Sequence, residues 1–184
     1  MSDRLVTADR LNADFFTLLD LPKSFAVDQA TLDDRFRQLQ REVHPDRFAA
    51  ADDAARRASM MLATQINEAY QTLRSPLKRA IYLLKLADVD VGSESNTAMS
   101  PEFLMSQMVW REQVDDGHAD GDVEALAHIQ TTIADEIDAA YQALAIALDE
   151  SKTLSDAVEL VRRLMFLEKL HEGIDDAIFD LENH

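Results

Sequence analysis

The sequence contains no cysteine, and only four glycines and four prolines among its 184 residues. Without cysteine the chain has no disulfide, no thiolate zinc site, no iron–sulfur ligation of its own and no cysteine nucleophile. So few glycines and prolines do not supply the many tight turns of a β-sandwich or barrel. The longest uninterrupted apolar run, residues 143–148, is far too short to span a membrane. These absences favour a mostly helical protein.

The formal charge of −17 is concentrated in the second half of the chain. Residues 1–92 hold 13 Lys and Arg against 14 Asp and Glu, whereas residues 93–184 hold 5 against 21. The acidic half would repel nucleic acid and anionic lipid headgroups, so neither is a predicted partner. The alternative is that the acids form a well-solvated helix surface that aids solubility. Because the first dozen residues lack the apolar core of a signal peptide, we expect a cytoplasmic location.

Apolar spacing and proline positions predict an all-α fold. Leu32, Phe36, Leu39 and Val43 form one helical stripe, which His44-Pro45 ends because the residue before proline is disfavoured in a helix. Serine followed by proline, at 75–76 and at 100–101, is typical of a helix N-cap and first helical residue. The predicted helices cover residues 15–21, 28–43 or 31–43 (starting at Asp28 or Thr31), 53–73, 77–86, 102–115, 122–150 and 160–181, with a turn at 116–121.

These segments suggest two helical modules. We expect an N-terminal extension at residues 1–13, a first module at 14–87, a linker at 88–99 and a three-helix bundle at 100–184. Gly173, inside the last helix, is unfavourable by up to about 1 kcal/mol relative to alanine and lowers the expectation of a straight helix.

Motifs for catalysis are missing from the sequence. It has no glycine-rich phosphate loop, no Gly-x-Ser-x-Gly and no His-Glu-x-x-His, and its five histidines lie far apart. We therefore predict no enzyme activity, no catalytic residue, no metal and no cofactor. The alternative from another class is a small acidic metal-dependent hydrolase that uses His44 and Asp46. His171, in the apolar stripe of the last helix, is interpreted as a hydrogen-bonded histidine at the edge of the core.

His44-Pro45-Asp46 falls in the break between two amphipathic segments and is followed by Ile66-Asn67-Glu68-Ala69-Tyr70. This combination resembles a J-domain, the module that activates Hsp70 chaperones, over residues 14–75. The resemblance implies that His44 and Asp46 contact the Hsp70 ATPase domain from a tip that Pro45 makes rigid. The arginines near this tip suit an acidic docking surface. They are Arg35, Arg37, Arg41 and Arg47, the last at a position where the family usually has lysine.

The rest of the chain is similar to one branch of J-domain proteins. Residues 75–84, Phe103-Leu104-Met105 and residues 161–170 resemble the bacterial form of the iron–sulfur co-chaperone family HscB. The resemblance implies that the bundle binds the cluster scaffold IscU and delivers it to the Hsp70 HscA, whose ATP hydrolysis the J-domain stimulates. The implied client-contact residues are Leu104, Met105, Met108, Glu112 and Phe166.

Each of these client-contact residues has an alternative place in the bundle core, because one face of the helix must be buried. The sequence does not decide whether Trp110 is buried. Val109 stands where the family often has an acid, which leaves its share in binding open. A second functional alternative is a J-domain protein whose bundle serves another client or a dimer interface.

Overall fold

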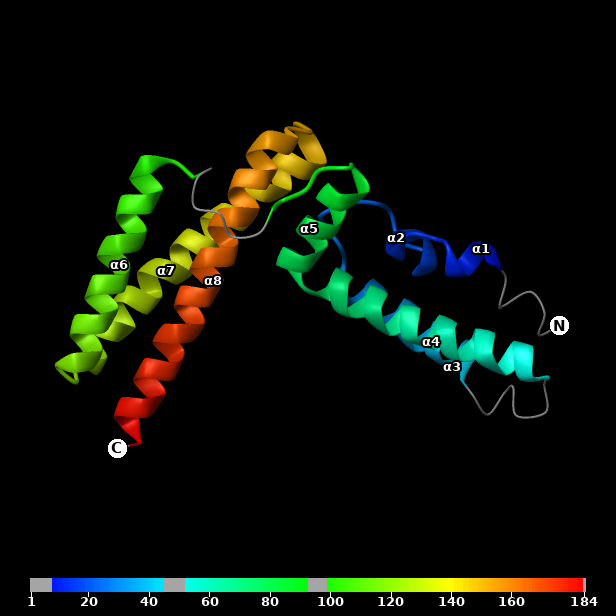
Figure 1. Ribbon diagram of the computed structural model, residues 1–184, viewed down its shortest axis with the longest axis horizontal. Coiled ribbons are helices and arrows are strands. Elements are labelled where there is room, and N and C mark those ends of the chain that lie inside the picture. Colours follow the sequence, from blue (N-terminus) through cyan, green and yellow to red (C-terminus); the bar gives the residue numbers. More distant parts are fainter. Residues whose placement is uncertain (1–7, 45–51, 93–98, 184) are drawn as a thin grey trace. The chain divides into compact units, whose positions relative to one another are not determined.

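The computed structural model describes residues 8–44, 52–92 and 99–183, and within these ranges every regular element is a helix (Figure 1). The elements are α1 (Ala8–Leu11), α2 (Phe15–Leu18), α3 (Gln29–Val43), α4 (Asp53–Arg74), α5 (Pro76–Leu86), α6 (Pro101–Ala119), α7 (Val123–Ala145), the π-helical turn η4 (Ile146–Glu150) and α8 (Leu154–Glu182). The all-α prediction is confirmed. Contacts divide the chain into two units, Met1–Leu83 and Leu84–His184, which are described separately.

In the first unit, α3 and α4 pack side by side as an antiparallel hairpin (Figure 1). Both helices begin at aspartate N-caps: the Asp28 carboxylate accepts a hydrogen bond from the Thr31 N–H at 2.8 Å, and Asp52 accepts one from the Ala55 N–H at 2.7 Å. Such caps satisfy backbone donors that the first helical turn leaves unpaired. The apolar stripes predicted from the sequence supply much of the core. Its largest fully buried side chains are Phe16, Leu19, Leu32, Leu62, Ile66 and Leu73.

Helix α5 starts where the sequence predicts it. The Ser75 hydroxyl accepts a hydrogen bond from the Lys78 N–H at 3.3 Å, and Pro76 is the first helical residue. Further along α5, Tyr82 contacts the start of α2. Its hydroxyl accepts a hydrogen bond from the Phe15 N–H at 2.9 Å, and the rings of Tyr82 and Phe15 stack with their centroids 4.4 Å apart. This contact joins segments that are 67 residues apart in the sequence.

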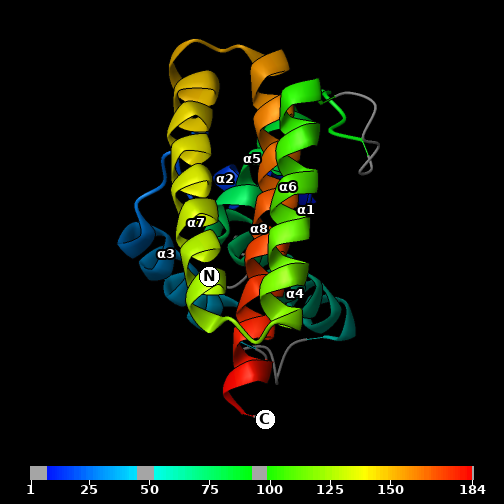
Figure 2. The same cartoon turned by 90° about the vertical axis from the view of Figure 1, so that its left-hand side faces the viewer.

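In the second unit, α6, α7 and α8 form a three-helix bundle, drawn from the side with its helices upright in Figure 2. The Ser100 hydroxyl caps α6 by accepting a hydrogen bond from the Phe103 N–H at 3.3 Å, and Pro101 occupies the first turn, as predicted. A core cluster joins all three helices. Its buried members are Phe103, Leu126, Ile129, Ile133, Leu167 and Ile174.

The structure corrects three predicted boundaries in the bundle. The last helix begins at Leu154 and not at residue 160. Helix α6 does not end at Asp115 but continues to Ala119, so the predicted turn at 116–121 is partly helical. Gly117 is buried in this extra turn, where a Cβ atom would lie only 3.1 Å from Leu126 Cδ2. A helix through Gly117 can therefore approach α7 closely. The predicted helix 122–150 is α-helical to Ala145 and ends in the π-helical turn η4.

Gly173 does not interrupt α8, which runs unbroken over 29 residues, and a Cβ atom there would meet nothing within 4 Å. Among the helices of the described ranges, none combines the length and the apolar character needed to cross a membrane.

Candidate functional site

The end of the α3–α4 hairpin at which the chain leaves α3 borders a groove of about 530 Å³. His44 is the C-cap residue of α3, exposed and with extended backbone angles (φ −58°, ψ 132°), where the chain leaves the helix. The groove is lined by Arg37, Gln40, Arg41, Val43, His44, Ala63 and Asn67. Of the predicted Hsp70-contact residues, the structure thus brings Arg37, Arg41 and His44 together. Pro45, Asp46 and Arg47 lie outside the described residues.

Two hydrogen bonds across the hairpin fix the shape of this groove. The hydroxyl of Ser59, which is almost completely buried in α4, donates to the carbonyl oxygen of Val43 at 2.8 Å. It thereby satisfies the last carbonyl of α3, directly before His44. The Gln40 side-chain amide donates to Asn67 Oδ1 at 3.1 Å. Sequence reasoning missed both bonds, because spacing along one helix does not reveal which residues of two helices meet.

The predicted basic residues of α3 form ion pairs within the unit. Arg35 lies 2.8 Å from the Asp20 carboxylate, and Arg37 Nη2 lies 2.6 Å from Asp34 Oδ1. The hydrogen bond to Asp34 and the negative charge of that carboxylate raise the pKa of Arg37 above its ordinary value. Arg35 is not among the groove-lining residues. These carboxylate partners were not anticipated, although the Asp34–Arg37 pair has the three-residue spacing that brings side chains together on a helix.

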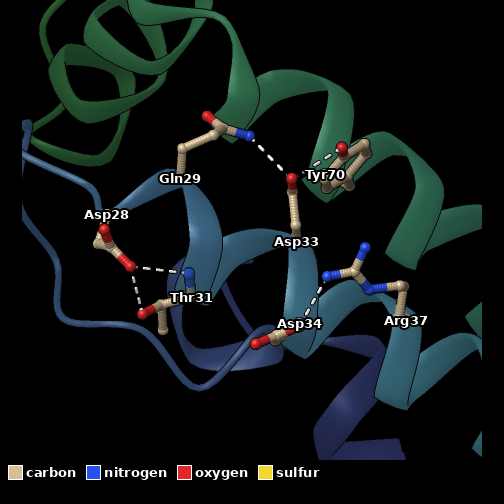
Figure 3. Close-up of polar contacts among 7 residues, drawn as sticks. All are labelled: Asp28, Gln29, Thr31, Asp33, Asp34, Arg37 and Tyr70. Atoms are coloured by element: carbon tan, nitrogen blue, oxygen red, sulfur yellow. Dashed lines mark hydrogen bonds and ion pairs between the residues drawn. The ribbon is translucent and has the colours of Figure 1, made fainter.

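The neighbouring carboxylate, Asp33, belongs to a separate network (Figure 3). It accepts hydrogen bonds from the Gln29 amide at 2.9 Å and from the Tyr70 hydroxyl at 3.0 Å. These bonds lower the pKa of Asp33, and the bond to Asp33 raises the pKa of Tyr70. The Tyr70 ring stacks on Phe36 at 4.0 Å. Asp33 therefore helps to hold α3 against α4.

The second candidate surface is the outward side of α6. Met105 and Met108 are 68% and 73% exposed, and Val109 beside them is 49% exposed. Leu104 is half-buried and Glu112 is exposed. Large apolar side chains this exposed have lost little contact with water, so they contribute little to the bundle core. The helix buries Phe103 and Gln107 instead, and Trp110 packs partly buried against the core cluster.

Phe166, the predicted client-contact residue of α8, lies between the core and the surface. Its ring is half-buried and packs against the core cluster. The Phe103 ring meets it edge-on at 5.8 Å, and the Arg111 guanidinium lies 5.2 Å from its centroid. Phe166 therefore has a structural role in the bundle in addition to any contact that its exposed edge makes with a partner.

Potential metal ligands are scattered. Within residues 8–44, 52–92 and 99–183, no three His, Asp or Glu side chains are arranged to hold a metal ion. His171 lies half-buried on α8, with its Nδ1 3.4 Å from the Asp175 carboxylate.

Comparison with known proteins agrees with this geometry. Residues 14–82 match the DnaJ domain family, and residues 99–175 match the family described as "HSCB C-terminal oligomerisation domain". A helical hairpin with His44 at its end and a DnaJ-domain match define a J-domain co-chaperone. A protein named as a co-chaperone HscB homologue from Paraburkholderia xenovorans is 50% identical over 94% of this chain and 98% of its own length. A homologue of the same name from Azoarcus sp. is 47% identical over the same shares of the two chains.

The solved structure of the chaperone HscB from Vibrio cholerae superposes with a TM-score of 0.81. It is 34% identical, over 92% of this chain and 99% of that one. The chain belongs to the HscB family of co-chaperones. The predicted family resemblance is therefore confirmed.

Proposed function

We propose that this protein couples an Hsp70 of the HscA type to the iron–sulfur scaffold IscU. In this proposal the first unit stimulates ATP hydrolysis by the Hsp70, and the bundle holds the scaffold. The chain itself contributes no catalytic residue and no cofactor. Iron–sulfur cluster maturation is promoted because the client and the activation signal reach the Hsp70 together.

The Hsp70-contact residues of the proposal are His44, Pro45 and Asp46, together with the basic side chains Arg35, Arg37, Arg41 and Arg47. Support comes from the groove at the end of the hairpin, where Arg37 and Arg41 lie with His44. Cationic side chains beside His44 attract an acidic partner and orient it on encounter. Binding then favours the hydrolysis-competent state of the Hsp70, which is a population shift toward the state that the J-domain binds more tightly.

The observation that carries the client half of the proposal is the exposure of Met105 and Met108 on α6. Methionine is flexible and polarisable, so it adapts to the shape of a partner. Leu104 and Glu112 lie on the same helix, and Phe166 presents a half-buried ring nearby in the bundle. An apolar patch with acidic neighbours suits a client whose contact surface combines apolar and basic side chains.

The test is single-turnover ATP hydrolysis by HscA, with this protein and IscU added separately and together. The proposal expects acceleration by this protein alone and greater acceleration with both. His44→Gln should abolish the acceleration without changing IscU affinity, because His44 is exposed at the end of a helix in the other unit. If this protein accelerates ATP hydrolysis equally with and without IscU, the bundle binds another client. Unchanged stimulation by the His44→Gln variant would refute the role of the hairpin.

A further inference from the structure

Arg37 lies in the groove and also forms an ion pair within its own helix. Its guanidinium lines the groove with Arg41 and His44, yet it is bound to Asp34 of its own helix at 2.6 Å. We propose that Asp34 is an internal competitor of the partner Hsp70: its carboxylate binds Arg37 in the free protein and must be displaced by a carboxylate of the partner. Asp34 would thus set the affinity of docking. This inference rests on the proposed function.

The Arg37–Asp34 ion pair is exposed enough for a partner carboxylate to replace Asp34. Both side chains are largely in water, with 63% of Arg37 and 76% of Asp34 exposed. An exposed pair between flexible side chains is worth little, because solvent screens it and ordering two long side chains costs entropy. A partner carboxylate in the groove can therefore replace Asp34 at small cost. A planar guanidinium also binds an incoming carboxylate through two parallel N–H groups.

Asp33 does not share this role. Its carboxylate accepts hydrogen bonds from Gln29 and from Tyr70, so it is held by neutral donors of α3 and α4 (Figure 3). Among the residues that the structure describes, Asp34 is hydrogen-bonded to Arg37 alone (Figure 3). The two successive aspartates thus differ in function: one stabilises the hairpin and the other holds the docking cation.

The size of the effect follows from the exposure of the pair. Exposed ion pairs contribute little, which corresponds to a factor of roughly 1.4 to 5 in a binding constant. Asp34→Asn keeps the size of the side chain and removes its charge. We therefore expect this variant to bind the Hsp70 about 1.4- to fivefold more tightly than the parent.

A double-mutant cycle tests this coupling with the full-length protein. The half-saturating concentration for stimulation of HscA is measured, in single-turnover ATP hydrolysis, for the parent, Asp34→Asn, Arg37→Gln and the double variant. Glu68→Gln, an exposed acid on α4, is the control for a change of one charge unit. Asp34→Asn should tighten binding more than Glu68→Gln does, and Arg37→Gln should weaken it. In a protein that already carries Arg37→Gln, Asp34→Asn should increase the affinity no more than the charge control does. Thermal unfolding of each variant checks that the fold is kept.

Two results would overturn the inference while the proposed function stands. In the first, Asp34→Asn changes the affinity for HscA no more than Glu68→Gln does. In the second, the affinity gain from Asp34→Asn persists in the Arg37→Gln background. A failure of the proposed function gives a different result, because the His44→Gln and Arg37→Gln variants would then both stimulate ATP hydrolysis by HscA as much as the parent does.

Discussion

Replacing Met105 and Met108 together with alanine should weaken scaffold binding strongly and leave the bundle stable. Complete burial of a methionine side chain is worth about 1.5–3 kcal/mol. Since 68% of Met105 and 73% of Met108 are still exposed, a client can add about 1–2 kcal/mol at each by covering the remainder. Each truncation then weakens binding by roughly 5- to 30-fold. The same exposure means that little core packing is lost in the free protein.

The assay is isothermal titration calorimetry, which measures the affinity of IscU for the parent and for the Met105→Ala/Met108→Ala variant. The chain offers a matched control in Met60 and Met61 of α4, which are 62% and 61% exposed and lie in the other unit. Their replacement by alanine removes the same chemical groups without touching α6. Urea unfolding followed by the fluorescence of Trp110, the single tryptophan, reports on the bundle alone.

An affinity within twofold of the parent value would refute the reasoning, as would an equal loss in the Met60→Ala/Met61→Ala control. Phe166→Ala is a poorer probe of the same surface. Its ring packs on the core cluster, so truncation lowers bundle stability as well as any contact with the client.

Four further predictions concern stability. Gly173→Ala should stabilise the bundle by about 0.5–1 kcal/mol. Gly117→Ala should destabilise it by about 1 kcal/mol or more, because the added Cβ would press on the fully buried Leu126. Urea unfolding followed by Trp110 fluorescence measures both changes. Ser59→Ala should cost the first unit about 1 kcal/mol, measured by circular dichroism in urea, because the last carbonyl of α3 loses its donor. Burial raises the pKa of Asp14, but hydrogen bonds from Thr17 leave it below the ordinary value of 3.8. The resulting stability is present above that value and lost as the pH falls through the lower folded pKa, so Asp14→Asn should flatten the acid limb of thermal unfolding.

Much of the fold could be predicted because local signals mark its helix boundaries. Asp28, Ser75 and Ser100 each cap the helix that was predicted to follow. These signals are local, so they survive without knowledge of the tertiary packing. The extension of α6 past Asp115 could not be predicted, because a glycine that normally marks a turn is tolerated where a close neighbour needs the space.

The candidate site was less accessible to sequence reasoning. Helix α6 has apolar residues on adjoining sides, so periodicity alone did not decide which side faces the core; the structure buries Phe103 and exposes Met105 and Met108. The pairing of Arg35 with Asp20 depends on the chain folding back between helices. Contacts of that kind require the tertiary arrangement, which spacing within one helix does not contain.

The exposed thioethers of α6 also have a chemical consequence under oxidative stress. Oxidants that reach the surface convert methionine to its sulfoxide, a polar and chiral group. Met105 and Met108 are accessible to such oxidants, while the bundle core beneath them consists largely of aliphatic and phenyl groups that do not react in this way. Mild peroxide would therefore turn the apolar patch polar without unfolding the bundle, and methionine sulfoxide reductases would restore it.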